Sequence, residues 1–331
     1  MRILITGILG FVAGYVISEL KDKGHEIVGI DILDAAGKEK ARRLPRDVTV
    51  LNCDLSELGQ ISPLLDETFP DLLIHLAAQS SAGKSFDDPH GTFISNAVGS
   101  LNLLESMRKK EYHGKAVFVG TSEMYRGGKE RVPVNEDAPF LPVSPYAASK
   151  AAQDMMAEQY SQCYALKIVR TRSFSHTGPG QTTVFAIPAF AQQLALIGAG
   201  KKEPVLEVGN LDVVRDYTDV RDVARAYVLL LEKGRPGEAY NVSSGKGRSV
   251  RDILMKMIEI SGLKVELKTI PSKIRRSDIE YLVGDNSKIS RETGWRPDFG
   301  IDETLSSVLE YWREQVREGT TPGGKQSLVR G

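Results

Sequence analysis

Short apolar runs alternate with longer amphipathic stretches along the first half of the chain. The run Leu72–Ala77 is almost continuously apolar, as is typical of a strand buried on both faces of a parallel sheet. Between such runs, Phe11–Lys23 and Ser56–Phe69 have the length and pattern of helices. The pattern predicts strands at Arg2–Thr6, Glu26–Ile30, Val48–Cys53, Leu72–Ala77, Ala116–Gly120 and Lys167–Arg172. This alternation predicts βαβ units, and therefore an α/β fold with a doubly wound parallel sheet.

The amino-acid composition of the chain changes after residue 180. Arginine, glycine and proline become denser around Pro179–Gln181, Gly209–Asp216 and Pro271–Asp278. We expect residues 1–180 to form the sheet domain, with a segment at about 218–243 that returns to it. Residues 181–217 and 244–318 are expected to form a smaller C-terminal lobe, and residues 319–331 a flexible tail.

Composition excludes several classes of protein. Hydrophobic residues make up 41% of the 331 residues, so a sizeable core can form. Lys+Arg and Asp+Glu both total 43, which gives no global attraction to nucleic acid or to a membrane surface. The two cysteines predict neither a disulfide framework nor a metal site. The apolar run before Gly7 is too short for a signal peptide or a membrane span, which favours a cytoplasmic protein.

A glycine-rich turn follows the first predicted strand and opens the first predicted helix. Gly7 permits the tight turn, and Gly10 lets the backbone approach a pyrophosphate. Ala13 stands where the third glycine of this fingerprint packs helix against strand, a position that needs only a small side chain. The start of the helix, at Phe11 and Val12, offers N–H groups to an anion. We therefore predict a Rossmann dinucleotide site.

An acidic residue ends the second predicted strand about twenty positions after this turn. Asp31, followed by Ile32, can accept a hydrogen bond from a ribose 2′-hydroxyl and would repel a 2′-phosphate. The sequence therefore predicts NAD(H) as the preferred cofactor, with NADP(H) possible. Asp34 is a competing candidate for the same role.

The third and fourth predicted strands end in further cofactor candidates. Asp54 and Leu55 suit the adenine edge, although Asp54 could equally belong to the N-cap region of the next helix. The fourth strand is followed by small residues that would let a cofactor lie across the strand tips. We interpret His75 as a hydrogen-bonded core residue. The candidates at this strand are Leu76, Ala77 and Ala78 for the cofactor and Ser80 for the substrate.

Tyr146 and Lys150 are one helical turn apart, on one face of a predicted helix. A phenol with a pKa of about 10 is a poor acid–base catalyst at neutral pH, and a nearby ammonium would lower that pKa. Such pairs are common in helices. Here, however, the pair follows the nucleotide turn and Thr121. The Thr121 hydroxyl lies at the end of the fifth predicted strand and can bind a carbonyl oxygen. This order along the chain favours a catalytic role for Tyr146 and Lys150 over a structural one.

These residues resemble those of the extended short-chain dehydrogenase/reductases that act on nucleotide sugars, over residues 1 to about 315. The resemblance implies a catalytic set of Thr121, Tyr146 and Lys150, in which Lys150 also holds the cofactor ribose. It further implies that Asn96 supports the cofactor region and that Phe174 contacts the cofactor.

Two further segments, Arg172–Gln181 and Gly209–Asp222, are similar to those of GDP-4-dehydro-6-deoxy-D-mannose reductases, which form GDP-D-rhamnose. The implied substrate is a GDP-linked 6-deoxyhexose. Ser175 stands where the family usually has Asn, and Arg126 where it usually has Gly. The candidate substrate residues are Ser80, Glu123, Ser175, Asn210, Arg215 and Arg275, the two arginines being candidates for the diphosphate.

Alternatives to a reductase stay open. Glu123, two residues beyond Thr121, is where dehydratases of this superfamily keep their base, so a 4,6-dehydratase or a 4-epimerase is the nearest alternative. A non-catalytic sensor of nucleotide sugars or dinucleotides is the alternative from another class. By family analogy, helices near His90–Lys110 and Pro145–Tyr164 are expected to build a homodimer interface.

Overall fold

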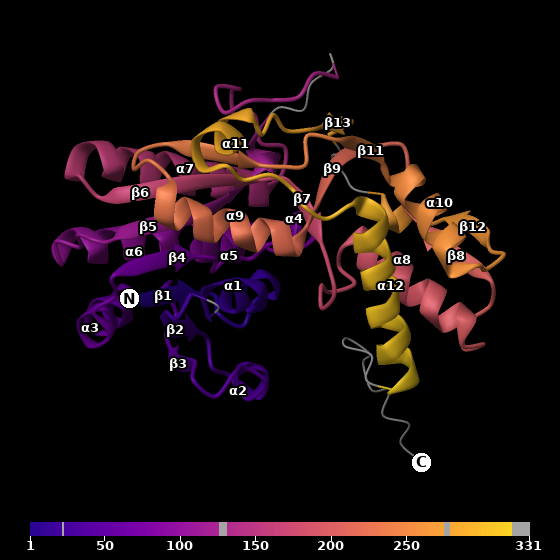
Figure 1. Ribbon diagram of the computed structural model, residues 1–331, viewed down its shortest axis with the longest axis horizontal. Helices are drawn as coiled ribbons and strands as arrows, with labels where there is room; N and C mark the ends of the chain where they lie inside the picture. The colour runs from indigo at the N-terminus through magenta and orange to yellow at the C-terminus, as the bar shows by residue number, and fades with distance from the viewer. Residues whose placement is uncertain (22, 126–130, 275–278, 320–331) are drawn as a thin grey trace.

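Seven parallel strands form the largest sheet of the protein, seen in a computed structural model that describes residues 1–21, 23–125, 131–274 and 279–319. Their order is β10-β6-β5-β4-β1-β2-β3, so the predicted doubly wound α/β fold is confirmed. Figure 1 shows β6 to β3 stacked from top to bottom. The strands are β1 (Arg2–Thr6), β2 (Glu26–Asp31), β3 (Thr49–Asn52), β4 (Leu72–His75), β5 (Lys115–Thr121), β6 (Lys167–Ser173) and β10 (Ala239–Val242).

Helices cover both faces of this sheet. In β1, Ile3 and Ile5 pack into one core and Leu4 into the other, the two-residue alternation of a strand that is buried on both sides. One face is covered by α1 (Phe11–Lys21) and α9 (Val220–Lys233). The other is covered by α3 (Leu58–Thr68), α6 (Gly99–Lys109) and α7 (Pro145–Tyr164). The predicted strands and helices of the first half are therefore present, with small shifts at their ends.

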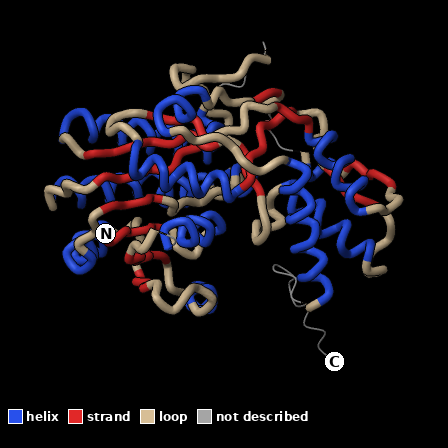
Figure 2. The backbone as a smooth tube through the Cα atoms, viewed as in Figure 1, coloured by secondary structure: helices blue, strands red, loops and turns tan. Residues whose placement is uncertain are grey.

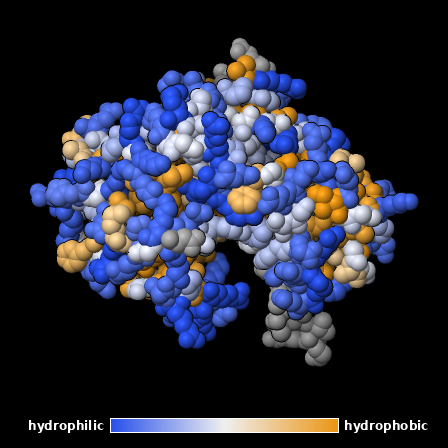
Figure 3. Space-filling view, viewed as in Figure 1, coloured by the Kyte–Doolittle hydropathy of each residue, from blue (hydrophilic) through white to orange (hydrophobic). Residues whose placement is uncertain are grey.

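A second lobe has its own hydrophobic core, on the right in Figures 1 and 2. Three helices, α8 (Ala186–Gly198), α10 (Val250–Ser261) and α12 (Ile301–Arg317), surround this core together with the parallel pair β8 (Val205–Val208) and β12 (Glu266–Thr269). A small sheet links the lobes, and its strands are β7 (Ser175–Thr177), β9 (Val214–Asp219), β11 (Gly247–Ser249) and β13 (Tyr281–Leu282). The outline in Figure 3 is notched between the two lobes.

The chain crosses between the lobes more than once. The segment predicted at about 218–243 supplies strand β10 to the large sheet and helix α9 to one of its faces. Helix α11 (Ser287–Thr293) follows, and Ile289 and Trp295 pack into the core of that sheet, although the sequence placed them within the smaller lobe. The domain limits themselves stay a prediction, and the predicted tail beyond residue 319 lies outside the described residues.

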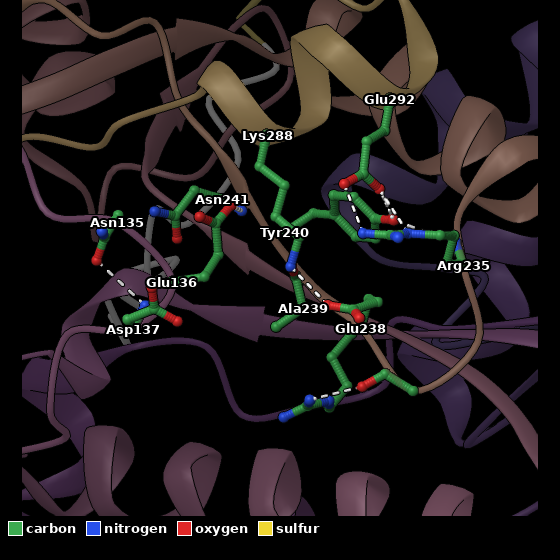
Figure 4. Close-up of polar contacts among 12 residues, drawn as sticks. Asn135, Glu136, Asp137, Arg235, Glu238, Ala239, Tyr240, Asn241, Lys288 and Glu292 are labelled. Atoms are coloured by element: carbon green, nitrogen blue, oxygen red, sulfur yellow. Dashed lines mark hydrogen bonds and ion pairs between the residues drawn. The ribbon is translucent and has the colours of Figure 1, made fainter.

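The outer edge of strand β10 is covered by side chains, as Figure 4 shows for several of them. The Asn241 N–H donates to Glu136 Oε1 at 2.7 Å, and Lys288 Nζ donates to the Ala239 carbonyl at 2.8 Å. Glu292 accepts hydrogen bonds from Arg235 and from the hydroxyl of Tyr240, a residue of β10. An exposed edge strand invites pairing with another chain, so these contacts close the edge of the sheet.

Short helical segments complete the described structure. They are α2 (Ala35–Ala41), α4 (Ala82–Ser85), α5 (Pro89–Phe93), the π-helical η1 (Ile94–Val98) and the 3₁₀ turns η2 (Ser122–Met124) and η3 (Pro271–Lys273). The π-helical turn joins α5 directly to α6, and such turns are frequent at functional sites. Within the part of the chain that the structure describes, no helix is long and apolar enough to cross a membrane.

Candidate active site

The turn between β1 and α1 is packed tightly against the tip of β4. Gly7 has a φ of +71°, and a Cβ placed on it would lie 2.7 Å from the Cα and N of Ala77. The Gly7 N–H donates to the Ile30 carbonyl at 2.8 Å, and the Ala77 N–H donates to Thr6 Oγ1 at 3.2 Å. The turn therefore joins the ends of β1, β2 and β4, and forms a cradle that fits the pyrophosphate of a dinucleotide.

Asp31 lies beside this turn. Its carboxylate accepts the N–H of Leu9 at 2.9 Å and the N–H of Ile32 at 2.9 Å. The competing candidate, Asp34, instead caps α2 by accepting the Gly37 N–H at 2.7 Å. The carboxylate beside the turn is thus that of Asp31.

Asp54 lies three residues before Glu57, the N-cap of the following helix, whose N-cap region was one of its two expected places. Its Oδ1 accepts the Ser56 N–H at 2.9 Å, while α3 starts after Glu57. Leu55 is buried in the core beneath α3 and α6. Adenine contacts by these residues stay a prediction.

A cleft of about 1140 Å³ brings together most of the predicted site residues. Five cofactor candidates lie outside its lining, namely Asp31, Ile32, Asp54, Leu55 and Ala77. The residues that line it are Gly7, Gly10, Phe11, Val12, Leu76, Ala78 and Phe174 from the cofactor set, Thr121, Tyr146 and Lys150 from the catalytic set, and Ser80, Glu123, Ser175, Asn210 and Arg215 from the substrate set. The catalytic and substrate candidates therefore face one space with the nucleotide turn.

Two neighbouring elements present the catalytic set. Thr121 ends β5, and its Oγ1 accepts the N–H of Glu123 at 3.3 Å. Helix α7 starts at Pro145 after Ser144, whose Oγ accepts the Ala147 N–H at 3.1 Å. A Ser N-cap followed by Pro is a typical helix start, and it places Tyr146 in the first turn beside the strand ends.

The pKa of Tyr146 is raised above its ordinary value. Burial is the main cause, the charge of Glu123 adds to it, and a hydrogen bond with Thr121 acts in the opposite direction. The sequence predicts that Lys150 lowers this pKa. In the structure the Lys150 ammonium is instead bound to the Val119 carbonyl, at 2.6 Å, and to Gln153.

Burial lowers the pKa of Lys150 to about 7, and the charge of Asp154 acts against this shift. Asp154 is itself bound by Arg170 at 2.8 Å and by Arg172 at 3.1 Å. Its negative charge is therefore shared among three cations, which limits what it can do for the lysine.

Asn96 ties the helix of the catalytic pair to the loop after β4. Its Oδ1 accepts the Gln79 N–H at 2.7 Å, and its Nδ2 donates to the Gln79 carbonyl and to Ser149 Oγ, both at 3.0 Å. Ser149 directly precedes Lys150. Asn96 thus holds two sides of the cleft together from the π-helical turn η1.

His75 is buried and has partners on both ring nitrogens, Thr6 Oγ1 at 2.7 Å and Ser100 Oγ at 2.8 Å. Burial lowers the pKa of His75 to about 3, so the ring is neutral. It is the hydrogen-bonded core residue that the sequence predicts.

Not every substrate candidate can be placed. Arg215 lines the cleft, and its Nη1 donates to the Val214 carbonyl at 3.0 Å and to the Ile279 carbonyl. Arg275 lies outside the described residues, as does Arg126.

Two residues at the site were not singled out from the sequence: His176, which lines the cleft, and Gln153, which contacts Lys150. His176 lies in the predicted segment Arg172–Gln181, and its ring is stacked 6.5 Å from that of Phe11 at the start of α1. Its Nδ1 donates to the Phe174 carbonyl at 3.0 Å, which leaves Nε2 as an acceptor. Gln153 reaches Lys150 from the next turn of α7, and the i,i+3 spacing is the only signal for it in the sequence.

The described residues, 1–21, 23–125, 131–274 and 279–319, contain no group of three or more His, Cys, Asp or Glu side chains that could hold a metal ion.

Comparison with known proteins adds to this geometry. A GDP-6-deoxy-D-mannose reductase of Pseudomonas aeruginosa is 33% identical over 266 residues, which are 80% of this chain and 87% of that protein. The structure of RMD from Pseudomonas aeruginosa complexed with NADPH aligns with a TM-score of 0.81 and 29% identity, over 95% of this chain and 99% of that one. A UDP-glucose 4-epimerase of Thermus thermophilus in complex with NAD aligns with a TM-score of 0.85 and 32% identity, over the same shares.

Other relatives are dehydratases and epimerases, among them a GDP-mannose 4,6-dehydratase of Yersinia enterocolitica and a UDP-glucose 4-epimerase of Corynebacterium glutamicum. The family model described as GDP-mannose 4,6 dehydratase matches residues 4–308. The chain therefore belongs to this family, within the extended short-chain dehydrogenase/reductases.

Proposed function

We propose that the protein is a nucleotide-sugar reductase, which uses a nicotinamide dinucleotide to reduce the C4 ketone of a GDP-4-keto-6-deoxyhexose to GDP-D-rhamnose. The observation that supports this most is the single cleft that Thr121, Tyr146 and Lys150 share with the nucleotide turn at Gly7. The choice of sugar follows the relative named GDP-6-deoxy-D-mannose reductase.

Each catalytic residue has a distinct task in this proposal. The nicotinamide, when bound, supplies the hydride that adds to C4. Tyr146 donates a proton to the ketone oxygen, since a phenol is protonated at neutral pH and can act as the acid. Thr121 orients the same oxygen by a hydrogen bond. Lys150 holds the hydroxyls of the nicotinamide ribose.

NADH should bind more tightly than NADPH, by at least about tenfold, because a 2′-phosphate would meet the carboxylate of Asp31. Comparison of the two dissociation constants by fluorescence titration tests this. Asp31→Ser should bring the dissociation constants of NADH and NADPH closer together, because it should improve NADPH binding. The RMD structure of Pseudomonas aeruginosa contains NADPH, so tighter NADPH binding is a real alternative and would refute the preference.

The substrate is proposed to lie toward the smaller lobe. Ser80, Glu123 and Ser175 line the cleft beside the catalytic set. Asn210 and Arg215 line it too, and Arg215 comes from strand β9 of the small linking sheet. Arg215 is the described candidate for the diphosphate, since a guanidinium matches the geometry of phosphate oxygens and can bind two of them at once.

We further propose a cytoplasmic homodimer that forms through α7 and the helices around α5 and α6. Three large apolar side chains on this face are exposed to solvent, Phe93, Met155 and Tyr164. Burial of such side chains against a second copy of the chain is the expected driving force.

A 4,6-dehydratase is the second candidate, and the position of Glu123 favours it. The Glu123 carboxylate lines the cleft next to Tyr146, whose pKa it raises. Removal of a proton from C5 needs a base of this kind, whereas hydride addition to C4 does not.

Redox stoichiometry separates the two enzymes. With a GDP-4-keto-6-deoxyhexose, the protein should consume one NADH per alcohol formed, and Glu123→Gln should keep most of this activity. Mass spectrometry of products from GDP-mannose and from its 4-keto-6-deoxy derivative, each with and without NADH, provides the measurement. Conversion of GDP-mannose without net NADH use, lost in Glu123→Gln, would establish the dehydratase. NADH binding without turnover of any sugar would point to a sensor.

A further inference from the structure

The ammonium of Lys150 is held in a closed set of hydrogen bonds beneath the cleft. Its Nζ donates to the Val119 carbonyl at 2.6 Å and to Gln153 Oε1. Gln153 Nε2 donates to the same Val119 carbonyl at 3.1 Å. Lys150 is 3% exposed and Gln153 1%, so water competes little for these contacts.

The Lys150 ammonium keeps one N–H donor for the cleft. A lysine ammonium has three N–H donors, and Val119 and Gln153 accept two of them. One donor is left for a ligand in the cleft that Lys150 lines. The orientation of the Gln153 amide is fixed as well, because Oε1 must accept from the ammonium and Nε2 must donate to a carbonyl.

The neighbours of Gln153 reserve its oxygen for the lysine. Ser100 Oγ lies 3.2 Å from Gln153 Oε1 but only 2.6 Å from the Asn96 carbonyl, which can only accept. The Ser100 hydroxyl has one proton, and the shorter contact takes most of it. His75 Nε2 then donates to Ser100, and Thr6 donates to His75 Nδ1. Gln153 Oε1 is thus mainly an acceptor for the ammonium.

The neutral amide oxygen of Gln153 matters because little negative charge stabilises the buried ammonium of Lys150. Burial disfavours the ammonium, and the one anion that acts against this, Asp154, is shared with Arg170 and Arg172. His75, which is neutral, also lies near the Lys150 ammonium, and Tyr146 and Glu123 line the same cleft as Lys150.

We propose that Gln153 is a positioning residue of the active site, whose amide orients the Lys150 ammonium toward the cofactor ribose and favours its protonated form. This rests on the proposed function in one respect, the assignment of Lys150 as the lysine that holds the ribose. A merely structural Gln153 would fill its space and satisfy its own hydrogen bonds without any effect on how Lys150 titrates.

The test compares Gln153→Met with Gln162→Met. Methionine has similar length and no amide, and Gln162 is an exposed glutamine on the same helix. Gln153→Met should weaken NADH binding about tenfold at neutral pH, and part of this loss should be recovered at lower pH, where Lys150 is protonated again. Gln162→Met should bind like the wild type. This readout needs no sugar substrate.

The pH profile of kcat gives a second readout with a defined sign. The alkaline limb is the pH range in which kcat falls because Lys150 loses its proton. Loss of the amide oxygen lowers the pKa of Lys150 further, so this limb should move to lower pH by about one unit, a tenfold change in the protonation constant. Gln153→Glu places a carboxylate beside the ammonium and should move the limb up.

The outcomes separate this proposal from the proposed function. If folded Gln153→Met binds NADH as tightly as wild type at every pH, or if both variants move the limb the same way, Gln153 does not position Lys150. If Gln153→Met does not fold, the test falls to Gln153→Glu. An alkaline limb of kcat that stays at its wild-type pH in folded Gln153→Glu would also show that Gln153 does not position Lys150. If the wild type binds NADH but reduces no 4-keto sugar, the proposed function fails, while the NADH comparison still decides the role of Gln153.

Discussion

Tyr146→Phe should lower kcat for ketone reduction roughly a hundredfold or more, the usual contribution of a general acid, while NADH affinity stays near that of the wild type. The substitution keeps the ring that packs beside the strand ends and removes only the hydroxyl that meets Thr121. Single-turnover kinetics with a GDP-4-keto-6-deoxyhexose would show whether the loss falls on the chemical step.

Tyr164→Phe is the matched control for this experiment. Tyr164 is the last residue of the same helix, and its side chain does not line the cleft; phenylalanine keeps the ring that the proposed dimer would bury. The control should turn over like the wild type. Near wild-type turnover by folded Tyr146→Phe would contradict its assignment as the proton donor.

The sequence was enough to predict the residues that lie at strand ends. In a doubly wound sheet the carboxyl ends of all strands meet along one edge, so order along the chain is enough to gather Gly7, Leu76 and Thr121. The same reasoning brought Ser80 and Glu123 into the cleft, because both follow strands of that sheet.

Contacts between side chains from distant segments could not be predicted in this way. The bond from Lys150 to the Val119 carbonyl joins residues 31 positions apart, and it depends on how deeply α7 packs on β5. The burial of Leu55 in the core beneath α3 and α6 likewise depends on how distant helices pack. The position of Trp295 in the core of the large sheet had no sequence signal, because one apolar residue gives no period.

Gly7→Ala should weaken NADH binding at least about tenfold and lower the stability of the protein. The left-handed φ of +71° alone costs alanine about 1–2 kcal/mol. The added Cβ would also lie 2.7 Å from backbone atoms of Ala77, and no rotamer can relieve an overlap with backbone. The turn must therefore move, and with it the N–H groups at the start of α1 that are proposed to hold the pyrophosphate.

Gly14→Ala separates this effect from a general response to mutation of the same helix. Gly14 is an exposed residue inside α1, and a Cβ there meets nothing within 4 Å. Alanine should stabilise the helix by about 0.5–1 kcal/mol and leave NADH binding unchanged. Thermal unfolding of both variants, with and without NADH, measures the two effects together. NADH should raise the midpoint of Gly14→Ala as much as that of the wild type and raise that of Gly7→Ala much less, since stabilisation by a ligand follows its affinity for the folded state. An equal rise in all three proteins would show that the turn at Gly7 does not hold the cofactor.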